Sequence, residues 1–214
     1  MENKKLKLCL GTVQFGLDYG INNSNGKPPK EKSLEVLDCA YKNGIRYFDT
    51  AAAYGDAEEI LGEFIKKNNL KDKIFITSKL SPNIISQNEK EIKEIIENAL
   101  RETLKKLNID KLYGYYLHTP EYVHNDEIMA ALRRCKDKGL VENIGVSIYE
   151  EKDAIYAASL PVDIIQIPYN VLDQRLNKTN FFDIAQKNKV KIFARSAFLQ
   201  GLLFMEENKI PENL

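Results

Sequence analysis

The chain contains few of the residues that hold metal ions or form disulfides. Its 214 residues include two histidines and three cysteines, and no two cysteines form a CxxC pair. The cysteines, Cys9, Cys39 and Cys135, are odd in number and widely spaced. A metal site or a disulfide framework needs closely spaced ligands or paired cysteines. We therefore predict no metal site, and we interpret the cysteines as buried, reduced thiols of a cytosolic protein.

An excess of charge of either sign is also lacking, as are long apolar runs. The chain has 31 basic and 31 acidic residues, which argues against a large basic surface for nucleic acid. No apolar run approaches the roughly 20 residues that span a bilayer. The N-terminal residues 1–5 lead straight into a short strand-like segment without the apolar core of a signal peptide. We predict a cytoplasmic globular protein with neither nucleic acid nor membrane as a partner.

Strand-like and helix-like segments alternate along the whole chain. The predicted strands are Leu6–Leu10, Ile45–Asp49, Lys73–Lys79, Lys111–Leu117, Glu142–Ser147, Asp163–Ile167 and Val190–Ala194. They recur about every 30 residues, the size of a βα unit. The clearest helix carries Ile92, Ile96, Leu100 and Leu104, an apolar stripe with a 3.6-residue period. This alternation predicts an α/β fold in one domain, 1–214, with helices covering a parallel sheet.

Two local patterns add detail. Asp56 precedes a helix-like segment and Glu59 follows three residues later, which predicts a capping box with aspartate as the cap. Residues 16–29, after the first strand, are rich in Gly, Asn and Pro and predict an irregular loop. Such a loop could overhang the mouth of a barrel or simply connect two elements, and the sequence favours neither.

Four residues with proton-transfer chemistry lie near the ends of successive predicted strands. Asp49 ends the second strand and Tyr54 follows it, Lys79 ends the third, and His118 follows the fourth. The carboxyl ends of parallel strands meet at one mouth, where catalytic residues collect. A free tyrosine has a pKa near 10, and a nearby ammonium lowers it. Lys79 could supply that charge, Asp49 could hold Lys79, and His118 could orient a carbonyl.

Taken singly, each of these residues has a simpler interpretation. A tyrosine or lysine at a strand end is usually part of the solvated surface, and an aspartate there often caps a helix. A lone histidine is more often a hydrogen-bonded structural residue. All four together, at three neighbouring strand ends, favour a functional site.

The sequence around these residues resembles the aldo-keto reductase family. The similarity begins with the Asp49–Gly55 segment and its following Glu58, Glu59, Leu61 and Gly62. It continues in the order of the family through residues 77–79, 116–118, 144–147, 166–170 and 194–203. It therefore covers nearly the whole chain, which makes it more specific than any single motif.

This resemblance implies a TIM-type (β/α)8 barrel that reduces carbonyl compounds with NADPH. Asp49, Tyr54, Lys79 and His118 fall on the catalytic tetrad of the family, with Tyr54 as the general acid. The implied cofactor-binding residues are Thr12, Asp49, Ser147, Gln166, Arg195, Ser196 and Phe198. The implied substrate is a small aldehyde or ketone, with a sugar derivative as one option.

Three departures from the family pattern stand out. Position 148 is Ile where many relatives have Asn, so one contact to the nicotinamide carboxamide is lost or replaced. Arg195 stands where many relatives stack an aromatic ring on the nicotinamide. A guanidinium there would repel the oxidised, positively charged ring, which predicts weaker binding of NADP⁺ than of NADPH. The chain also encodes only about seven βα units, whereas a barrel typically takes about 250 residues and eight strands.

The missing eighth strand leads to further predictions. The barrel would be incomplete at its C-terminal end and without the basic segment that grips the adenosine 2′-phosphate. Unpaired edges on the first and last strands would favour self-association. The alternative to an enzyme is a weak or inactive barrel that binds a nucleotide or a protein. Another alternative is a different barrel enzyme that uses Lys79 as a Schiff-base amine, which leaves Asp49, Tyr54 and His118 without a clear purpose.

Overall fold

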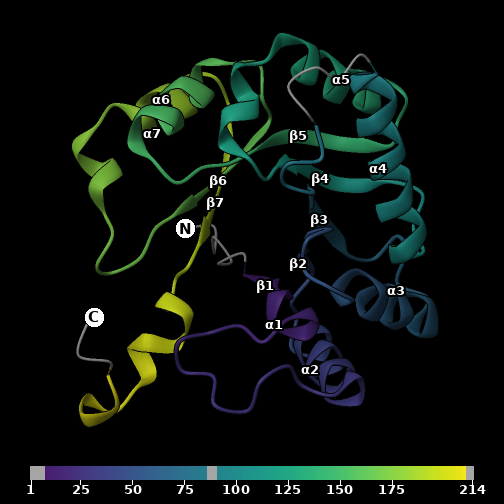
Figure 1. Ribbon diagram of the computed structural model, residues 1–214, viewed down its shortest axis with the longest axis vertical. Helices are drawn as coiled ribbons and strands as arrows, with labels where there is room; N and C mark the ends of the chain where they lie inside the picture. The colour runs from purple at the N-terminus through teal and green to yellow at the C-terminus, as the bar shows by residue number, and fades with distance from the viewer. Residues whose placement is uncertain (1–7, 86–90, 211–214) are drawn as a thin grey trace, which may run out of the picture.

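The structure is a computed structural model that describes residues 8–85 and 91–210 (Figure 1). Its strands form one sheet in which every neighbouring pair is parallel. Their order in the seven-stranded sheet is their order in the chain. The strands are β1 (Cys9–Gly11), β2 (Tyr47–Asp49), β3 (Phe75–Leu80), β4 (Leu112–Leu117), β5 (Val141–Ser147), β6 (Ile164–Pro168) and β7 (Lys191–Arg195). The seven predicted strands are confirmed, although Leu6 and Lys7 of the first lie outside the described residues.

Helices follow the strands and form an outer layer around the curved sheet (Figure 1). The α-helices are α1 (Val13–Gly16), α2 (Lys30–Lys42), α3 (Ala57–Asn68), α4 (Ile92–Leu107), α5 (Asp126–Asp137), α6 (Glu151–Ser159) and α7 (Phe181–Lys187). Short 3-10 helices are η1 (Pro120–His124), η2 (Arg175–Lys178), η3 (Leu199–Phe204) and η4 (Glu207–Lys209). The apolar stripe of α4 is buried as its period predicts, with Ile96 and Leu100 fully enclosed. The fold is thus a TIM-type barrel of seven βα units.

The barrel is open between its first and last strands. In the described part of the chain, β1 pairs only with β2, and β7 pairs only with β6. Burial follows this layout, because the central strands β4 and β5 are almost wholly buried whereas β1 and β7 are partly exposed. The prediction of unpaired edges is therefore confirmed for the described residues.

The cysteine prediction holds for only one residue. Cys135, which belongs to α5, is buried, but Cys9 and Cys39 are exposed. Cys9 is exposed because it lies on the edge strand β1, which has a neighbour on one side only. Cys39 lies on the solvent side of α2, where the Asn43 amide donates to its carbonyl oxygen. The apolar pattern around Cys9 was misleading because an edge strand has the same kind of sequence as a central strand.

The predicted capping box is also wrong. Asp56 is the N-cap of α3, but its side chain makes no capping hydrogen bond. It pairs instead with Lys27 Nζ at 2.5 Å, which ties the loop after β1 to the start of α3. A side-chain cap is found at α5, where Asn125 Oδ1 accepts from the backbone N–H groups of Glu127 and Ile128.

Two glycines allow α1 to lie against the turn that carries Tyr54. A Cβ on Gly16 would lie 1.7 Å from the Tyr54 carbonyl oxygen, and one on Gly55 would lie 2.4 Å from the Gly16 oxygen. Gly55 also has a φ of +54°, which glycine adopts most easily. This close backbone contact holds the Tyr54 turn against α1.

Within the described residues, no helix is long and apolar enough to cross a membrane.

Candidate active site

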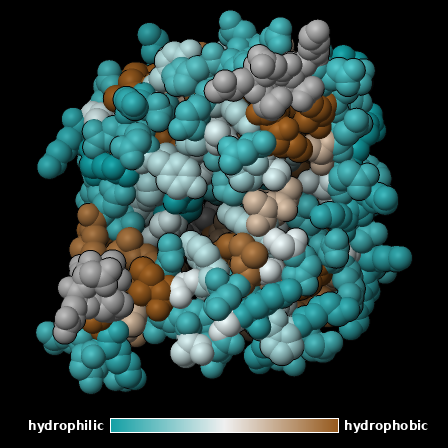
Figure 2. Space-filling model, viewed as in Figure 1, coloured by the Kyte–Doolittle hydropathy of each residue, from teal (hydrophilic) through white to brown (hydrophobic). Residues whose placement is uncertain are grey.

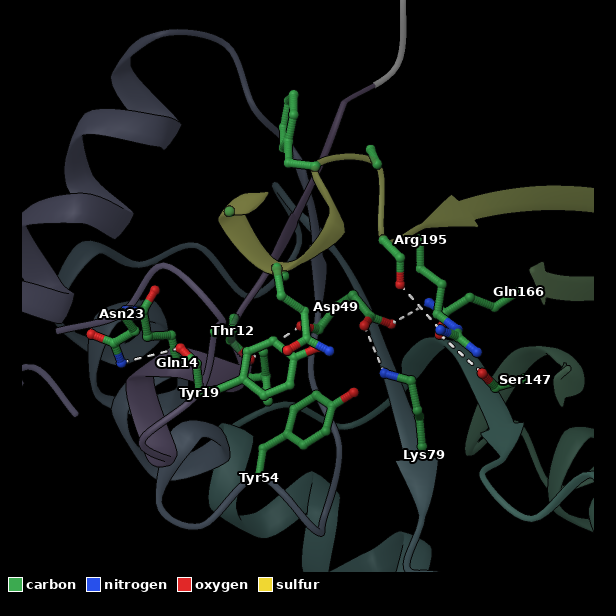
Figure 3. Close-up of a pocket in the computed structure, with 18 of the residues that line it drawn as sticks. Thr12, Gln14, Tyr19, Asn23, Asp49, Tyr54, Lys79, Ser147, Gln166 and Arg195 are labelled. Atoms are coloured by element: carbon green, nitrogen blue, oxygen red, sulfur yellow. Dashed lines mark hydrogen bonds and ion pairs between the residues drawn. The ribbon is translucent and has the colours of Figure 1, made fainter. Parts of the chain in front are cut away.

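A pocket of about 660 Å³ lies at the carboxyl ends of the strands. It brings together residues that are far apart in the chain, from Thr12 just after β1 to Arg195 at the end of β7 (Figure 3). All ten predicted site residues line it, namely Thr12, Asp49, Tyr54, Lys79, His118, Ser147, Gln166, Arg195, Ser196 and Phe198. Within the described residues, no group of three or more His, Cys, Asp or Glu side chains could hold a metal ion.

Asp49 is the hub of the hydrogen bonds on the pocket floor. Its Oδ2 accepts from Lys79 Nζ at 2.6 Å, and its Oδ1 accepts from Thr77 Oγ1 at 2.8 Å and from Gln166 Nε2 at 3.0 Å. Lys79 Nζ also donates to the Thr50 carbonyl oxygen at 2.8 Å. Donors on both carboxylate oxygens hold the Asp49 side chain in place. The parallel register aligns Asp49 with Thr77 on β3, which explains why these side chains meet.

Lys79 is held as a buried ammonium. Its side chain is 1% exposed, and burial alone would lower its pKa. The negative charge of Asp49, with Tyr54 beside it, more than offsets this, so the pKa of Lys79 lies above its ordinary value. A lysine kept protonated is a poor nucleophile, which argues against the Schiff-base alternative.

Tyr54 faces Lys79 across the pocket floor. The ammonium lies 4.8 Å from the centre of the Tyr54 ring. Burial raises the pKa of Tyr54 above its ordinary value, and Lys79 opposes that rise without cancelling it. The sequence argument considered only the ammonium and therefore had the net direction wrong in the protein without ligand. A phenol that stays protonated at neutral pH is nevertheless in the correct state to donate a proton.

His118 is neutral at physiological pH. Its ring meets the Tyr54 ring edge-on at 5.9 Å between centroids. Burial, together with the charge of Lys79, lowers the pKa of His118 to about 4. Its Nδ1 is buried and has no hydrogen-bond partner within the described part of the chain. A neutral imidazole beside a phenol can hold a carbonyl oxygen by donating one hydrogen bond.

Ser147 and Gln166 continue the hydrogen-bond chain away from Asp49. Ser147 Oγ donates to Gln166 Oε1 at 3.3 Å, and the Gln166 amide donates to Asp49. Ser147 Oγ and Gln166 Oε1 each keep a lone pair that can accept another hydrogen bond. Ile148, which stands in place of the more usual Asn, is buried and lies outside the pocket lining.

Arg195 is already stacked within the protein. Its guanidinium lies 4.2 Å from the centre of the Tyr149 ring and donates to the Ile148 carbonyl oxygen at 3.1 Å and to Ser196 Oγ at 3.2 Å. Its Nε is buried without a partner in the described residues. These contacts hold the Arg195 guanidinium in place where the residue lines the pocket.

The loop at residues 17–29 lines the pocket, which answers the question that the sequence left open. Tyr19, Asn22 and Asn25 reach the cavity, and the Asn22 N–H donates to the Gln200 carbonyl oxygen at 3.3 Å. Asn23 organises the loop, because its Nδ2 lies 3.0–3.1 Å from Asp18 Oδ1 and the carbonyl oxygens of Tyr19 and Gly26.

The lining residues that the sequence argument missed include Gln14, Tyr149 and Gln200. The only available signal was their position just after the ends of β1, β5 and β7.

Close by, hydrophobic side chains gather on the surface around η3 and η4, among them Phe198, Leu203, Phe204 and Ile210 (Figure 2).

Comparison with known proteins agrees with this arrangement. The model of the Aldo/keto reductase family matches residues 7–213, so the chain belongs to that family. Aldo-keto reductase YhdN of Bacillus subtilis is 29% identical over 83% of this chain and 55% of its own length. The chain spans between about half and two thirds of the length of such curated relatives.

Solved structures show the same fold. The thermostable aldo-keto reductase Tm1743, in complex with the inhibitor epalrestat, has a TM-score of 0.73 and 29% identity over 95% of this chain and 72% of its own. A Bombyx mori aldo-keto reductase in complex with NADP has a TM-score of 0.68 and 24% identity over 89% of this chain and 62% of its own. The second likeness, at this identity, concerns the fold alone.

Proposed function

We propose that this chain is an NADPH-dependent oxidoreductase domain that reduces a small aldehyde or ketone with Tyr54 as the general acid. One observation carries the proposal. A protonated Lys79, held by Asp49 and the Thr50 carbonyl oxygen, lies 4.8 Å from the Tyr54 ring within a single pocket. A cation fixed beside a phenol stabilises the phenolate that forms when the proton leaves.

The residues of the pocket fit a dihydronicotinamide cofactor. Ser147 and Gln166 offer acceptor oxygens to a carboxamide, and the buried Arg195 Nε lacks a partner in the described residues. Thr12, Ser196 and Phe198 would lie along the rest of the cofactor. When bound, NADPH supplies a hydride. The fixed charge of Arg195 favours the neutral reduced ring over the oxidised cation, so we propose that NADP⁺ binds less tightly than NADPH.

The protein residues would then complete the reduction. His118 donates a hydrogen bond that holds the carbonyl oxygen of the substrate next to the Tyr54 hydroxyl. Tyr54 would pass its proton to the carbonyl oxygen in the reduction, so that the product is an alcohol. Lys79 stabilises the resulting phenolate until water returns the proton. Asp49 keeps Lys79 in place throughout.

The decisive experiment compares Tyr54→Phe with Tyr156→Phe, a control on the exposed face of α6. NADPH fluorescence is titrated with each protein, and NADPH consumption is followed with a small aldehyde. We expect Tyr54→Phe to bind NADPH as the parent does but to lose at least 100-fold in kcat, as typical for a missing general acid. Turnover retained in Tyr54→Phe, or no fluorescence change in the parent at high concentration, would refute the proposal.

The loop side of the pocket favours a hydroxylated substrate, such as a sugar derivative. Gln14, Asn22, Asn25 and Gln200 all line the pocket, and their side-chain amides make no hydrogen bond to any described residue. An amide offers both a donor and an acceptor, as a hydroxyl does.

This substrate preference can be tested with glyceraldehyde and propanal, which share a three-carbon aldehyde skeleton. With rates corrected for free aldehyde, we expect about tenfold higher kcat/KM for glyceraldehyde, since each hydrogen bond contributes about 1 kcal/mol. The double variant Gln14→Leu/Asn22→Leu should lose this preference and keep its rate on propanal. Equal rates for both aldehydes in the parent would rule out the preference.

We also propose that the open edges mediate self-association. Both β1 and β7 end the sheet, and Leu8 next to β1 is 57% exposed. Exposed strand edges pair readily with another chain. Size-exclusion chromatography with light scattering should find a dimer at micromolar concentration. A monomer over the whole concentration range would refute this proposal.

A further inference from the structure

A buried carboxylate lies directly behind the proposed active site and has no part in the chemistry described above. Glu58, in the first turn of α3, is 1% exposed. Its Oε1 accepts a hydrogen bond of 2.6 Å from Ser78 Oγ, and Ser78 is fully buried. No salt bridge involves Glu58 within the described residues. A buried carboxyl group without an ion pair is unusual and costs stability unless it is well hydrogen-bonded.

The hydrogen bond lies on the outer face of the sheet. Side chains alternate along a strand, so Ser78 points away from the pocket while Thr77 and Lys79 point into it. Thr77 and Lys79 indeed both contact Asp49 on the pocket floor. The Glu58–Ser78 hydrogen bond therefore joins α3 to β3 at the residue next to Lys79.

The same first turn of α3 holds Tyr54 in place. The Ala57 N–H donates to the Tyr54 carbonyl oxygen at 3.0 Å. Two residues before Tyr54, the Ala52 N–H donates to the Lys79 carbonyl oxygen at 3.3 Å. The segment from Ala52 to Glu58 is thus attached to β3 at two points, once through the backbone of Lys79 and once through the side chain of Ser78 on the outer face.

The groups around Glu58 do not offer another task for it. Burial raises the pKa of Glu58, and hydrogen bonds from Ser78 and Thr103 together with the Lys106 charge oppose that rise. Lys106 itself pairs with the neighbouring Glu59 at 3.9 Å. None of the residues Glu58, Ser78, Thr103 and Lys106 lines the pocket.

We infer that Glu58 is a positioning residue, whose hydrogen bond to Ser78 fixes the Tyr54 phenol at its distance from the Lys79 ammonium. The inference rests on the proposed function, since it assigns the residue to the same acid–base pair. Without this bond the first turn of α3 can move relative to β3. The two groups then separate, and Lys79 stabilises the phenolate less. Such a change slows proton transfer but leaves the cofactor and substrate contacts intact.

The test uses Ser78→Ala, Glu58→Gln and, as a control on the exposed side of α3, Glu59→Gln. We expect Ser78→Ala to lower kcat about tenfold with unchanged KM and unchanged NADPH affinity. The single variant Glu58→Gln should keep most of the activity of the parent, because its amide oxygen still accepts a hydrogen bond from Ser78. Glu59→Gln should match the parent. A lower melting temperature with unchanged kcat in Ser78→Ala would overturn the inference, because it would mean that Glu58 acts only on stability.

A second readout separates this inference from the proposed function. Proteins labelled with ¹³C at the tyrosine Cζ allow Tyr54 to be titrated without substrate, and Tyr54→Phe assigns its signal. We expect the midpoint of Tyr54 to move to higher pH in Ser78→Ala and to stay unchanged in Glu59→Gln. An unchanged midpoint in Ser78→Ala would overturn the inference even if the parent reduces carbonyls. A shifted midpoint in a protein without turnover would support the inference and refute the proposed function.

Discussion

Replacing Asp49 with Asn tests the electrostatics of the pocket floor directly. The asparagine oxygen can still accept from Thr77 and Gln166, whose hydrogen bonds to Asp49 are 2.8 and 3.0 Å long. What is lost is the 2.6 Å ion pair with Lys79, whose side chain is 1% exposed. Removing one partner of a buried pair costs about 3–5 kcal/mol. The Asp49 side chain is 14% exposed, and Lys79 keeps its hydrogen bond to the Thr50 carbonyl oxygen. We therefore expect Asp49→Asn to lower the free energy of unfolding by about 3 kcal/mol at pH 7.

The dependence of this loss on pH has a definite sign. In the parent, the raised pKa of Lys79 gives a stabilisation that is complete below the unfolded pKa and disappears as the pH rises through the folded pKa. In Asp49→Asn, burial of Lys79 is no longer offset, so its folded pKa falls below the unfolded one. The unfolded chain then binds more protons, and the variant gains stability as the pH rises toward about 10.4. The difference between parent and variant should therefore shrink from pH 7 to pH 9.

Urea unfolding followed by circular dichroism at pH 7, 8 and 9 measures both effects. Asp38→Asn is the matched control, because Asp38 pairs with Lys42 at 2.6 Å on the exposed surface of α2. Exposed pairs of this kind contribute about 0–1 kcal/mol, so the control should stay close to the parent at each pH. A loss below about 1 kcal/mol for Asp49→Asn at pH 7, the size expected of an exposed pair, would refute the description of a buried ammonium that depends on Asp49.

Three further predictions concern other parts of the site. The pKa of His118 is lowered to about 4, so its contribution to stability is complete above pH 6.5 and is lost as the pH falls through about 4. In acid unfolding, the free energy of unfolding of the parent should fall by roughly 1–2 kcal/mol more than that of His118→Asn over this range, a figure that allows for solvent screening of the half-buried ring. A parallel decline of both proteins would contradict that pKa. Gly16→Ala should cost about 3 kcal/mol in urea unfolding and lower kcat by displacing the Tyr54 turn, whereas Gly11→Ala, with open space around its Cβ, should cost far less stability. Arg195→Leu should reduce the ratio of NADPH to NADP⁺ affinity measured by titration, and an unchanged ratio would place the guanidinium away from the nicotinamide.

Much of the fold could be predicted from the sequence because its signals are local. A buried parallel strand reads as a short apolar run, and a surface helix such as α4 repeats its apolar residues every 3.6 positions. The position of Asp49, Lys79 and His118 followed from the same signals, since parallel strands bring their carboxyl ends to one side. What the local pattern cannot give is the number of neighbours a strand has, so Cys9 on the edge strand was expected to be buried and is exposed.

The finer properties of the site depend on contacts between distant segments. The net pKa direction of Tyr54 is the difference between burial and one nearby charge, and the sequence reveals only the charge. The stacking of Arg195 on Tyr149 joins β7 to the segment after β5, 46 positions apart. Asp56 illustrates the same limit, because Lys27, far away in the sequence, competes successfully for a side chain that was expected to cap α3.

Asn23 has a consequence for engineering this protein. One side chain holds the loop together by contacting three acceptors and by accepting from the Asn25 N–H. The neighbours that face the cavity, Asn22 and Asn25, use none of their own side-chain groups for this purpose. Asn23 lines the pocket as well, but it alone of the three asparagines uses its side chain to hold the loop, because the side chains of Asn22 and Asn25 make no hydrogen bond to a described residue. Libraries that randomise positions 22 and 25 and leave position 23 untouched should therefore yield folded proteins with altered ligand preference.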